Sequence, residues 1–442
     1  MWPWLILACD APPPDALGVG EVELGETVEG PSAATLRFTT TDVAAAWVEV
    51  ELADGLSWRF EAHTTDGEAH VAYLAGLPPG ATLQVRAVAE GEGGRAESAW
   101  MDWATREASS RIPPAVATVP MTDSLLYLAV LPFNPPAAVV FDGGGALVWW
   151  ALFPDGSALS QAVLSRDGMA VWVLVNSPVA GEGDAELWRV PIFEGEAEVV
   201  QIQGAHHDFV ELEDGSFLAL VSDIREVEGE SVAGDELQRV ATDGTTTRLW
   251  DTWDELEYDG EGEQVEGDDG DLLISWTHAN SLAWDAAHGR YLVGLRNRDA
   301  VAVVDGDDWT TRGWVGGEDS TYTMGAGTPF HRQHGVVATD AGVLLFDNGA
   351  QGEEDPSSRV VEFALDDAAG TYAEVWSWAG AEPLYSPYLG GVARLADGGH
   401  VVSWGGAGRM TRSDADGALV GQLDLTIGGA FGAVHPLERL GP

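Results

Sequence analysis

The strongest constraint on the fold is a repeat in the second part of the chain. An apolar stretch, a turn built on aspartate and a second apolar stretch recur, with the turns at Asp167, Asp214, Asp285, Asp340 and Asp397. These turns lie 47, 71, 55 and 57 residues apart. A four-stranded propeller blade takes roughly 40 to 50 residues, and loop insertions lengthen the interval. The five turns therefore predict five blades.

A sixth blade is expected from the two ends of the repeat region. We predict that it combines residues from Arg409 to Leu425 with residues from about Leu125 to Val130. Because both chain ends would then share a blade, no sheet edge would remain free. The prediction is thus an all-β protein with a six-bladed β-propeller over residues 112–442, beginning at the boundary marked by Pro113 and Pro114.

A smaller β-domain is predicted before the propeller, over residues 21–107. Apolar and polar residues alternate in several short runs, which are separated by Gly, Pro and Asp turns. This period is typical of an antiparallel sandwich. The segment from Tyr73 to Gly80 resembles a corner of fibronectin type III domains. We therefore expect a fibronectin-III or immunoglobulin-like sandwich that acts as a spacer or cap.

The first residues resemble a bacterial lipoprotein signal. The apolar run ends in Ile6, Leu7, Ala8 and Cys9, and a Pro-rich stretch follows. We expect residues 1–9 to be a signal peptide with lipid on Cys9, and residues 10–20 to be a tether. The protein would then be an exported periplasmic or cell-surface lipoprotein. The alternative is that Cys9 is a buried cysteine, and as the single cysteine it can form no internal disulfide.

The charge of the chain excludes several kinds of partner. It has 72 acidic and 21 basic residues, a net charge of −51, and every basic residue is arginine. Nucleic acid and bare anionic membrane both need a basic surface. We therefore expect no nucleic-acid partner, and contact with a membrane only through the N-terminal lipid.

No motif for a cofactor or a metal is evident. The sequence has neither a Gly-rich phosphate loop nor a Cys/His zinc spacing, so we expect no nucleotide cofactor and no resident metal. The acidic tract from Asp254 to Asp271 could bind Ca²⁺ through its oxygens. Because its acidic residues lack an ordered ligand spacing, a solvated loop at the rim of the channel is favoured.

Three histidines occupy equivalent positions in consecutive repeats. Counting back from each turn to the start of its strand gives Ser160, His207, His278, His334 and Gly390. Equivalent points of propeller blades lie at one height around the axis, so these imidazoles are predicted to form a ring. Each histidine alone could be structural, and His206 could take the place of His207. Three in register favour a functional site.

Several segments around these histidines resemble bacterial arylsulfate sulfotransferases. The resemblance spans about residues 112 to 442. It rests on the segments His206-His207-Asp208-Phe209, Trp276-Thr277-His278-Ala279-Asn280-Ser281, Leu295-Arg296-Asn297-Arg298-Asp299-Ala300-Val301, Arg332-Gln333-His334-Gly335 and Leu345-Phe346-Asp347-Asn348-Gly349. Members of that family are six-bladed propellers with a small N-terminal β-domain. They pass a sulfuryl group from a phenolic sulfate ester to a phenol, without a nucleotide sulfate donor.

The resemblance also implies roles for individual residues. His334 would be the nucleophile that becomes sulfated in a ping-pong reaction, and His207, His278 and Arg296 would surround the sulfuryl oxygens. Asn280 would orient the group. Three features depart from the family pattern: this chain cannot form the disulfide of well-known members, the lipid anchor through Cys9 is a variation, and Gly335 follows the nucleophile where bulkier residues are often seen.

A phenol would also need an aromatic surface near the ring. Trp276, Tyr322 and Phe330 are the candidates for a slot that stacks the substrate ring. The expected partners are therefore a small phenolic sulfate donor and a phenol acceptor.

Two other functions remain open from the residues alone. Three histidines on one ring could bind Zn²⁺ or Cu²⁺ in a metalloenzyme, although a neighbouring Arg296 argues against a cation. The propeller could also be a non-catalytic surface lipoprotein that binds ligands or partners through its loops.

Overall fold

The structure is a computed structural model that describes residues 17–26, 33–42, 45–121, 123–176, 184–266, 272–350, 352, 356–426 and 429–442. The chain divides into two compact units, Met1–Glu107 and Ala108–Pro442. The predicted signal peptide, its lipid site Cys9 and most of the predicted tether lie outside the described residues. No helix within the described ranges is long and apolar enough to cross a membrane.

The first unit is built from antiparallel strands. They are β1 (Val19–Glu26), β2 (Ala34–Thr40), β3 (Ala45–Leu52), β4 (Ser57–Asp66), β5 (Ala69–Leu74), β6 (Thr82–Gly91), β7 (Gly94–Glu97) and β8 (Met101–Ala104). Their order is β1-β2-β5-β4-β3-β6-β7, with β8 also paired to β6. Alternate residues of β2, β3, β5 and β6 enclose one apolar core, as period-two strands require. The fibronectin-like assignment of this unit stays a prediction.

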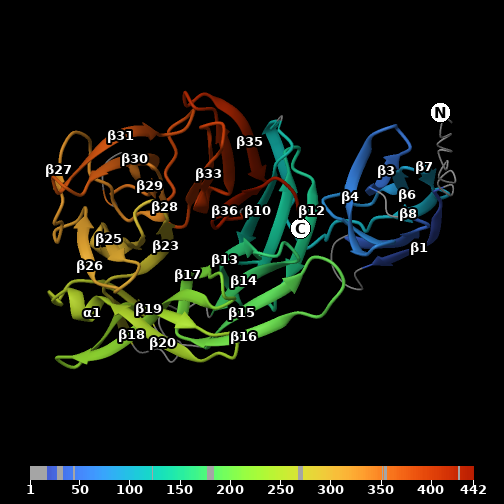
Figure 1. The fold of residues 1–442 in the computed structure, drawn as a ribbon. Helices are drawn as coiled ribbons and strands as arrows, with labels where there is room; N and C mark the ends of the chain where they lie inside the picture. The colour runs from blue at the N-terminus through green and yellow to red at the C-terminus, as the bar shows by residue number, and fades with distance from the viewer. Residues whose placement is uncertain are drawn as a thin grey trace, which may run out of the picture. The chain divides into compact units, whose positions relative to one another are not determined.

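The second unit contains six sheets, and each forms one blade (Figure 1). Blade 1 contains β36 (Val434–Leu437), β10 (Leu126–Leu131), β11 (Ala137–Asp142) and β12 (Leu147–Leu152). Blade 2 contains β13 (Ala158–Leu164), β14 (Ala170–Asn176), β15 (Asp184–Pro191) and β16 (Glu198–Gln203). Blade 3 contains β17 (Ala205–Glu211), β18 (Phe217–Val227), β19 (Glu230–Val240) and β20 (Thr246–Asp251), and it is extended by the hairpin of β21 (Glu263–Glu266) and β22 (Leu272–Ser275).

The other three blades follow in chain order. Blade 4 contains β23 (Ala279–Asp285), β24 (Arg290–Leu295), β25 (Ala300–Asp305) and β26 (Thr311–Val315). Blade 5 contains β28 (His334–Ala338), β29 (Gly342–Asp347), β30 (Arg359–Asp366), β31 (Thr371–Trp378) and the short β27 (Thr323–Met324). Blade 6 contains β32 (Gly391–Arg394), β33 (His400–Trp404), β34 (Arg409–Ser413), β35 (Leu419–Leu425) and β9 (Ala115–Val119). The described helices are single turns: α1 (Thr252–Glu255), η1 (Arg296–Arg298) and η2 (Gly405–Ala407).

The six-bladed propeller predicted from the repeat is confirmed. Each of the five aspartate turns joins the inner strand of a blade to its second strand, as between β13 and β14 or between β32 and β33. The six inner strands, β36, β13, β17, β23, β28 and β32, all line one central channel of about 590 Å³. Because they run in the same direction, the starts of these strands meet at one end of the channel.

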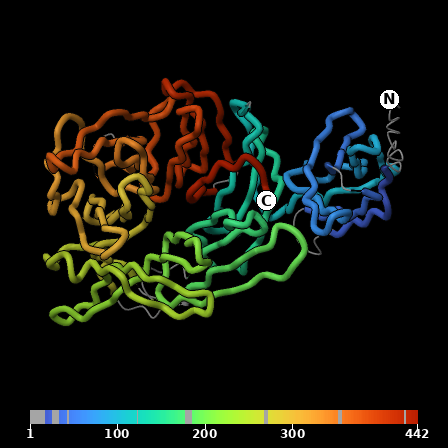
Figure 2. The backbone as a smooth tube through the Cα atoms, viewed as in Figure 1, coloured from blue at the N-terminus to red at the C-terminus, as the bar shows by residue number. Residues whose placement is uncertain are grey.

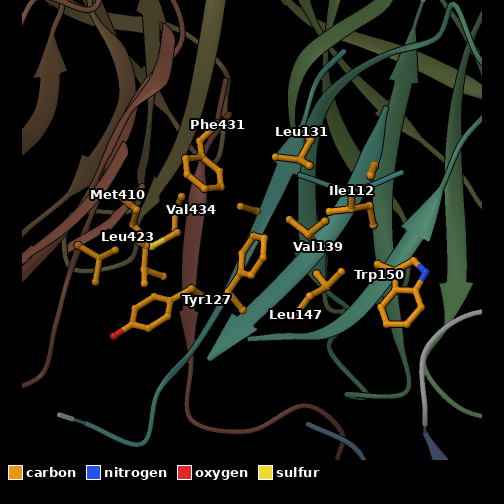
Figure 3. Close-up of a cluster of buried hydrophobic side chains, with 14 of the residues drawn as sticks. Ile112, Tyr127, Leu131, Val139, Leu147, Trp150, Met410, Leu423, Phe431 and Val434 are labelled. Atoms are coloured by element: carbon orange, nitrogen blue, oxygen red, sulfur yellow. The ribbon is translucent and has the colours of Figure 1, made fainter. Parts of the chain in front are cut away.

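The predicted composition of the sixth blade was wrong in detail. Residues of β34 and β35 pair with β33 and with β9, and not with β10. Strand β10 instead pairs with the C-terminal β36 in blade 1, and β9 pairs with β35 in blade 6. The first and last strands of the propeller therefore close the ring of blades in two adjacent blades (Figure 2). A buried cluster explains the choice. Phe431 and Val434 pack with Tyr127 of β10 and Leu423 of β35, which joins blades 1 and 6 (Figure 3).

Candidate active site

The structure brings the three histidines to one end of the central channel. His207 lies near the start of β17, His278 directly precedes β23, and His334 is the first residue of β28. The ring centroids of His207 and His278 are 4.9 Å apart. Positive charge on His334 or Arg296 would lower the pKa of both imidazoles, which places all four side chains in one electrostatic environment.

An unusual backbone conformation aims these imidazoles. His207 has φ 57° and His278 has φ 51°, a left-handed region that residues with a side chain seldom adopt. Register shifts interrupt each of the three strand pairs at this point. A bulge re-aims a side chain, and strained residues concentrate at functional sites. The inner strands are therefore bent where the histidines stand.

His334 is held in one tautomer by its neighbours. Its Nδ1 lies 2.7 Å from Oδ1 of Asn348 and 3.2 Å from the carbonyl oxygen of Arg332. The Asn348 amide nitrogen donates to the carbonyls of Ser386 and Leu389, at 2.7 and 2.9 Å, so its oxygen must face the imidazole. Since both groups near Nδ1 are acceptors, Nδ1 carries the proton and Nε2 keeps its lone pair.

Burial keeps the imidazoles neutral. The side chain of His334 is buried, and desolvation lowers its pKa to about 4 despite its hydrogen bond to Asn348. Burial also lowers the pKa of His207 and of His278 well below the ordinary value, and the neighbouring positive groups add to this effect. A neutral imidazole is a nucleophile or a base, so the site can attack an electrophile or accept a proton.

A second chain of contacts supports His207. Its Nδ1 lies 2.9 Å from Nδ1 of His206, and Nε2 of His206 lies 2.9 Å from Oδ1 of Asp235. The other oxygen of this buried carboxylate accepts from the hydroxyl of Thr277 and, at 2.7 Å, from the backbone N–H of Ala279. Asp235 of β19 thus binds both residues that flank His278, and it lies within ion-pair distance of the imidazole beside His207.

A polar layer lies one residue further into the channel. Asp208 accepts from Nε2 of Gln161 at 3.1 Å and from the backbone N–H of Leu282 at 2.8 Å. Oε1 of Gln161 lies 2.9 Å from Nε2 of His435. Burial raises the pKa of Asp208 to about 6 although these hydrogen bonds oppose the shift. The layer joins blades 1 to 4 directly behind His207.

Arg296 stands at the border between the imidazoles and an open cavity. Its backbone N–H donates to the carbonyl of His278 at 3.0 Å. Its Nη1 donates to Oε2 of Glu263 at 2.6 Å and to Oδ1 of Asn297 at 2.7 Å. The cavity of about 590 Å³ is lined by Glu261, Gly262, Glu263, Trp276, Arg296, Asn297, Arg298, Asp299, His331, Arg332 and Ala350.

The described acidic residues of the tract are exposed, as expected of a solvated loop, but the tract also makes specific contacts. Its described part runs from the end of α1 through a loop to β21, and two of its carboxylates bind arginines: Asp259 accepts from Arg298 at 2.7 Å, and Glu263 accepts from Arg296 at 2.6 Å. Residues 267–271 of the tract lie outside the described residues. Ion pairs with arginines therefore anchor two exposed acids of this loop beside the cavity.

Of the other predicted residues, Asn280 supports the backbone before His334, and Trp276 is a buried residue at the wall of the cavity beside Arg296. The Asn280 amide donates to the carbonyl of Gln333 at 2.7 Å, so it fixes the backbone just before His334. Trp276 packs on Trp253 with ring centroids 4.6 Å apart and lines the open cavity. Its buried Nε1 has no acceptor within the described ranges.

Two further predicted residues are not brought to the imidazoles. Tyr322 and Phe330 belong to an apolar cluster between blades 4 and 5, in which Phe330 packs against Phe363. The Tyr322 hydroxyl donates to Asp367 at 2.7 Å. Asp367 follows the end of β30, and that strand begins at the imidazole end of blade 5. The predicted stacking slot therefore includes neither ring.

The predicted metal alternative receives no support from the geometry. Among the described residues, the only three acidic, histidine or cysteine side chains with ligand atoms within 4.8 Å of one another are Asp223, Glu236 and Asp251. None of the three imidazoles belongs to this group. Asp251 is already engaged by Arg225 and Arg248, at 2.7 Å each.

Sequence reasoning missed the roles of five neighbours of the imidazoles. Asn348, Arg332 and His206 stand inside the segments that carry the family resemblance, but the sequence does not show what they contact. Asp235 and Glu263 lie on β19 and β21 of blade 3. In the sequence they differ in no way from the other 70 of the 72 Asp and Glu residues, so nothing singles them out.

The fold and the site define a propeller protein that gathers neutral imidazoles and a guanidinium at one end of its channel. The family model described as Arylsulfotransferase (ASST) matches residues 133–422. This match covers more than half of the chain, and the protein belongs to the arylsulfotransferase family. No curated protein sequence matches the chain.

Solved structures are similar only at a distance. Dihydro-heme d1 dehydrogenase NirN is 14% identical, with 96% of this chain and 76% of that chain covered and a TM-score of 0.33. Apo AztD from Citrobacter koseri is 11% identical, with 90% and 98% covered and a TM-score of 0.36. A DUF4784 family protein from Bacteroides caccae is 10% identical, with 92% and 95% covered and a TM-score of 0.30. At these values the similarities carry no argument about function.

Proposed function

We propose that this protein transfers a sulfuryl group from a phenolic sulfate ester to a phenol by a ping-pong reaction through sulfated His334. The observation that carries the proposal is the state of that imidazole. It is buried and neutral, and acceptors on the Nδ1 side leave the lone pair on Nε2. A nitrogen nucleophile prepared in this way suits the reaction of the family to which the chain belongs.

In the first half-reaction, Nε2 of His334 attacks the sulfur of the ester. The new N–S bond forms as the bond between sulfur and the aryl oxygen breaks, and the phenolate leaves with the electron pair. Burial lowers the pKa of His207 and His278 in the free protein, and we propose that the negative ester opposes this shift, so that one of the two imidazoles is protonated in this step. That imidazole gives its proton to the phenolate oxygen.

In the second half-reaction, the same imidazole acts as a base. It takes the proton of the acceptor phenol while the phenol oxygen attacks sulfur, and the N–S bond breaks to restore neutral His334. The proton given in one half-reaction returns in the other, so no net proton is consumed. The contact between the Nδ1 atoms of His206 and His207 would hold the His207 ring in place during these proton transfers.

Charge stabilisation would come from Arg296. Sulfuryl transfer resembles phosphoryl transfer, in which a loose transition state spreads negative charge over the non-bridging oxygens. A guanidinium that remains protonated can hold two such oxygens. We propose that Trp276 contacts the phenol ring from the cavity wall, and that Asn280 positions His334 through Gln333.

The test is direct detection of the intermediate. The protein is incubated with 4-nitrophenyl sulfate without an acceptor, digested under mildly alkaline conditions and analysed by mass spectrometry. We expect a burst of about one equivalent of 4-nitrophenol and a sulfuryl group on the peptide that contains His334. His334→Gln should lose both signals. A burst with the sulfuryl group on another residue would contradict the proposal.

We also propose that the protein is exported and anchored by lipid on Cys9. The support is the lipoprotein-like run that ends in Ala8 and Cys9. Expression in a bacterial host with a labelled fatty acid tests it. Label should follow the wild-type protein into the membrane fraction and be lost in Cys9→Ser, whereas equal labelling of both proteins would sink the idea.

A further inference from the structure

One carboxylate oxygen at the border of the site is shared by two arginines. Oε2 of Glu263 accepts from Nη1 of Arg296 at 2.6 Å and from Nη2 of Arg332 at 2.9 Å. Glu263 belongs to β21 of blade 3, Arg296 to η1 after β24 of blade 4, and Arg332 to the segment before β28 of blade 5. The three side chains line the same cavity. Two guanidiniums facing one oxygen form an anion-binding arrangement.

Arg332 is tied to His334 by its backbone. Its carbonyl is the second acceptor for Nδ1 of His334, and its N–H donates to Oδ1 of Asp299 at 2.7 Å. It has φ 53°, which places it in the left-handed region. These contacts hold the strained backbone, and the ion pair with Glu263 holds the guanidinium itself. The Arg332 guanidinium is therefore positioned relative to the nucleophile.

The exposure of the three partners shows which one can leave. The side chain of Arg296 is 9% exposed and that of Arg332 is 22% exposed, whereas that of Glu263 is 42% exposed. Burial alone would raise the pKa of Glu263, but the hydrogen bond and charge of Arg296 bring it below the ordinary value, so the group stays ionised. An ionised carboxylate at the more exposed end can be exchanged for another anion without uncovering the arginines.

We propose that Arg296 and Arg332 together form the clamp for the sulfuryl oxygens, and that Glu263 occupies this clamp in the free protein and is displaced by a sulfate ester. This inference rests on the proposed function for its substrate. An ester of sulfate carries one negative charge over three oxygens, so it can bridge both guanidiniums as the carboxylate does.

The internal carboxylate also acts on specificity. A ligand binds only if its interaction with the two arginines is stronger than that of Glu263. Neutral phenols and weakly binding anions therefore do not displace Glu263 from the clamp. In a chain with a net charge of −51, the same carboxylate keeps two guanidiniums from remaining unpaired between turnovers.

The experiment measures binding of inorganic sulfate by titration calorimetry, which needs no chemical step. Glu263→Gln keeps the size of the side chain and removes its charge, and we expect sulfate to bind about tenfold more tightly. Glu263→Asp withdraws the carboxylate by one methylene and should give a smaller gain. Arg332→Gln should bind sulfate at least about tenfold more weakly. Glu261→Gln is the control, because this exposed acid lines the same cavity and makes no arginine contact that the structure records.

Turnover then separates displacement from positioning. With 4-nitrophenyl sulfate, KM should fall in Glu263→Gln while kcat changes little, because only the competing anion is removed. If Glu263 serves to position the arginines, sulfate binding would weaken and kcat would fall in both Glu263 variants. That result overturns the inference, as does a gain in Glu261→Gln equal to that in Glu263→Gln.

Failure of this inference can be told from failure of the proposed function. If the variants bind sulfate as expected but His334 carries no sulfuryl group, the clamp stands and the transfer mechanism falls. If His334 is sulfated and Arg332→Gln binds sulfate like the wild type, the assignment of Arg332 is wrong and the mechanism stands.

Discussion

Blades 3, 4 and 5 carry a histidine at one equivalent position near the start of their inner strand, whereas blades 2 and 6 carry a serine and a glycine there. In blade 6 the equivalent residue is Gly390, with φ 109°, and a Cβ there would lie 2.5 Å from the ring of Phe346. In blade 2 it is Ser160, whose hydroxyl donates to Asn176 at 3.0 Å. His207 and His278 take a positive φ that glycine would adopt more easily. The equivalent position therefore serves packing in blade 6, whereas blades 3 and 4 hold a histidine there in a strained backbone.

The largest expected effect is on activity, and it distinguishes a histidine blade from blade 2. His334→Gln removes the proposed nucleophile and should lower the rate of 4-nitrophenol release by at least about 10³-fold. Ser160→Ala changes the equivalent position of blade 2 and should leave this rate within about twofold, since loss of one partly exposed hydrogen bond is a small change. A comparable loss of rate in both variants would mean that the histidine blades are not special.

The second prediction concerns the tautomer of the nucleophile. Asn348→Ala removes the acceptor that holds the proton on Nδ1 of His334, and kcat should fall about 10²-fold with little change in KM. Asn348→Asp restores an acceptor and should recover part of kcat, although it loses the amide donors to Ser386 and Leu389. Thermal unfolding of both variants is measured alongside. A loss of kcat in Asn348→Ala that only tracks lost stability would remove the positioning role.

The third prediction concerns pH. With 4-nitrophenyl sulfate, whose leaving phenolate is stable without a proton, the burst depends on neutral His334, and burial lowers the pKa of His334 to about 4. As the pH falls, this imidazole becomes protonated only near pH 4, so the burst rate should stay level at pH 6 and drop about tenfold per unit below about pH 4. An exposed imidazole would show the drop near pH 6.5. A burst rate that already halves at pH 6.5 would contradict the buried, neutral state.

The smallest expected effects are on stability, and they compare the equivalent positions of blades 6 and 4. Gly390→Ala forces a side chain into a left-handed backbone and against Phe346, and we expect it to lower the free energy of unfolding by about 2 kcal/mol. His278→Gly relieves a similar strain while it loses packing, so the change should stay within about 1 kcal/mol. Denaturant unfolding checks both values. Equal destabilisation by the two changes would show that the histidine blades carry no strain.

Much of the fold could be predicted from local sequence patterns. The predictions were wrong where strands pair with segments that are distant in the chain. The aspartate turns identified the inner strands because such a turn and its flanking apolar runs are contiguous in the chain. The pairing of β10 with β36 could not be read in this way, since any terminal strand can satisfy a free sheet edge. Packing of Phe431 between blades 1 and 6 decided it.

In the candidate site, too, the residues placed by the repeat were predicted, whereas those placed by contacts between distant segments were not. Register alone grouped His207, His278 and His334, because blades repeat around an axis. The aromatic residues were chosen by nearness in sequence, and Tyr322 failed because an inter-blade core and a hydrogen bond to Asp367 hold it elsewhere. The partners of the imidazoles could not be found without the tertiary structure, because they lie on other strands than the histidines. Asp235 belongs to β19, the third strand of blade 3, and Asn348 directly follows β29, the second strand of blade 5.

The sequence by itself determined the number of blades, the strands that face the axis and the ring of histidines, because these follow from a periodic pattern carried by neighbouring residues. Only the tertiary structure decided which ends close the propeller, which tautomer His334 holds and which acid occupies the arginines. Those outcomes depend on the meeting of side chains from different blades, and hydrogen bonds and ion pairs act only at short distances that chain order does not specify.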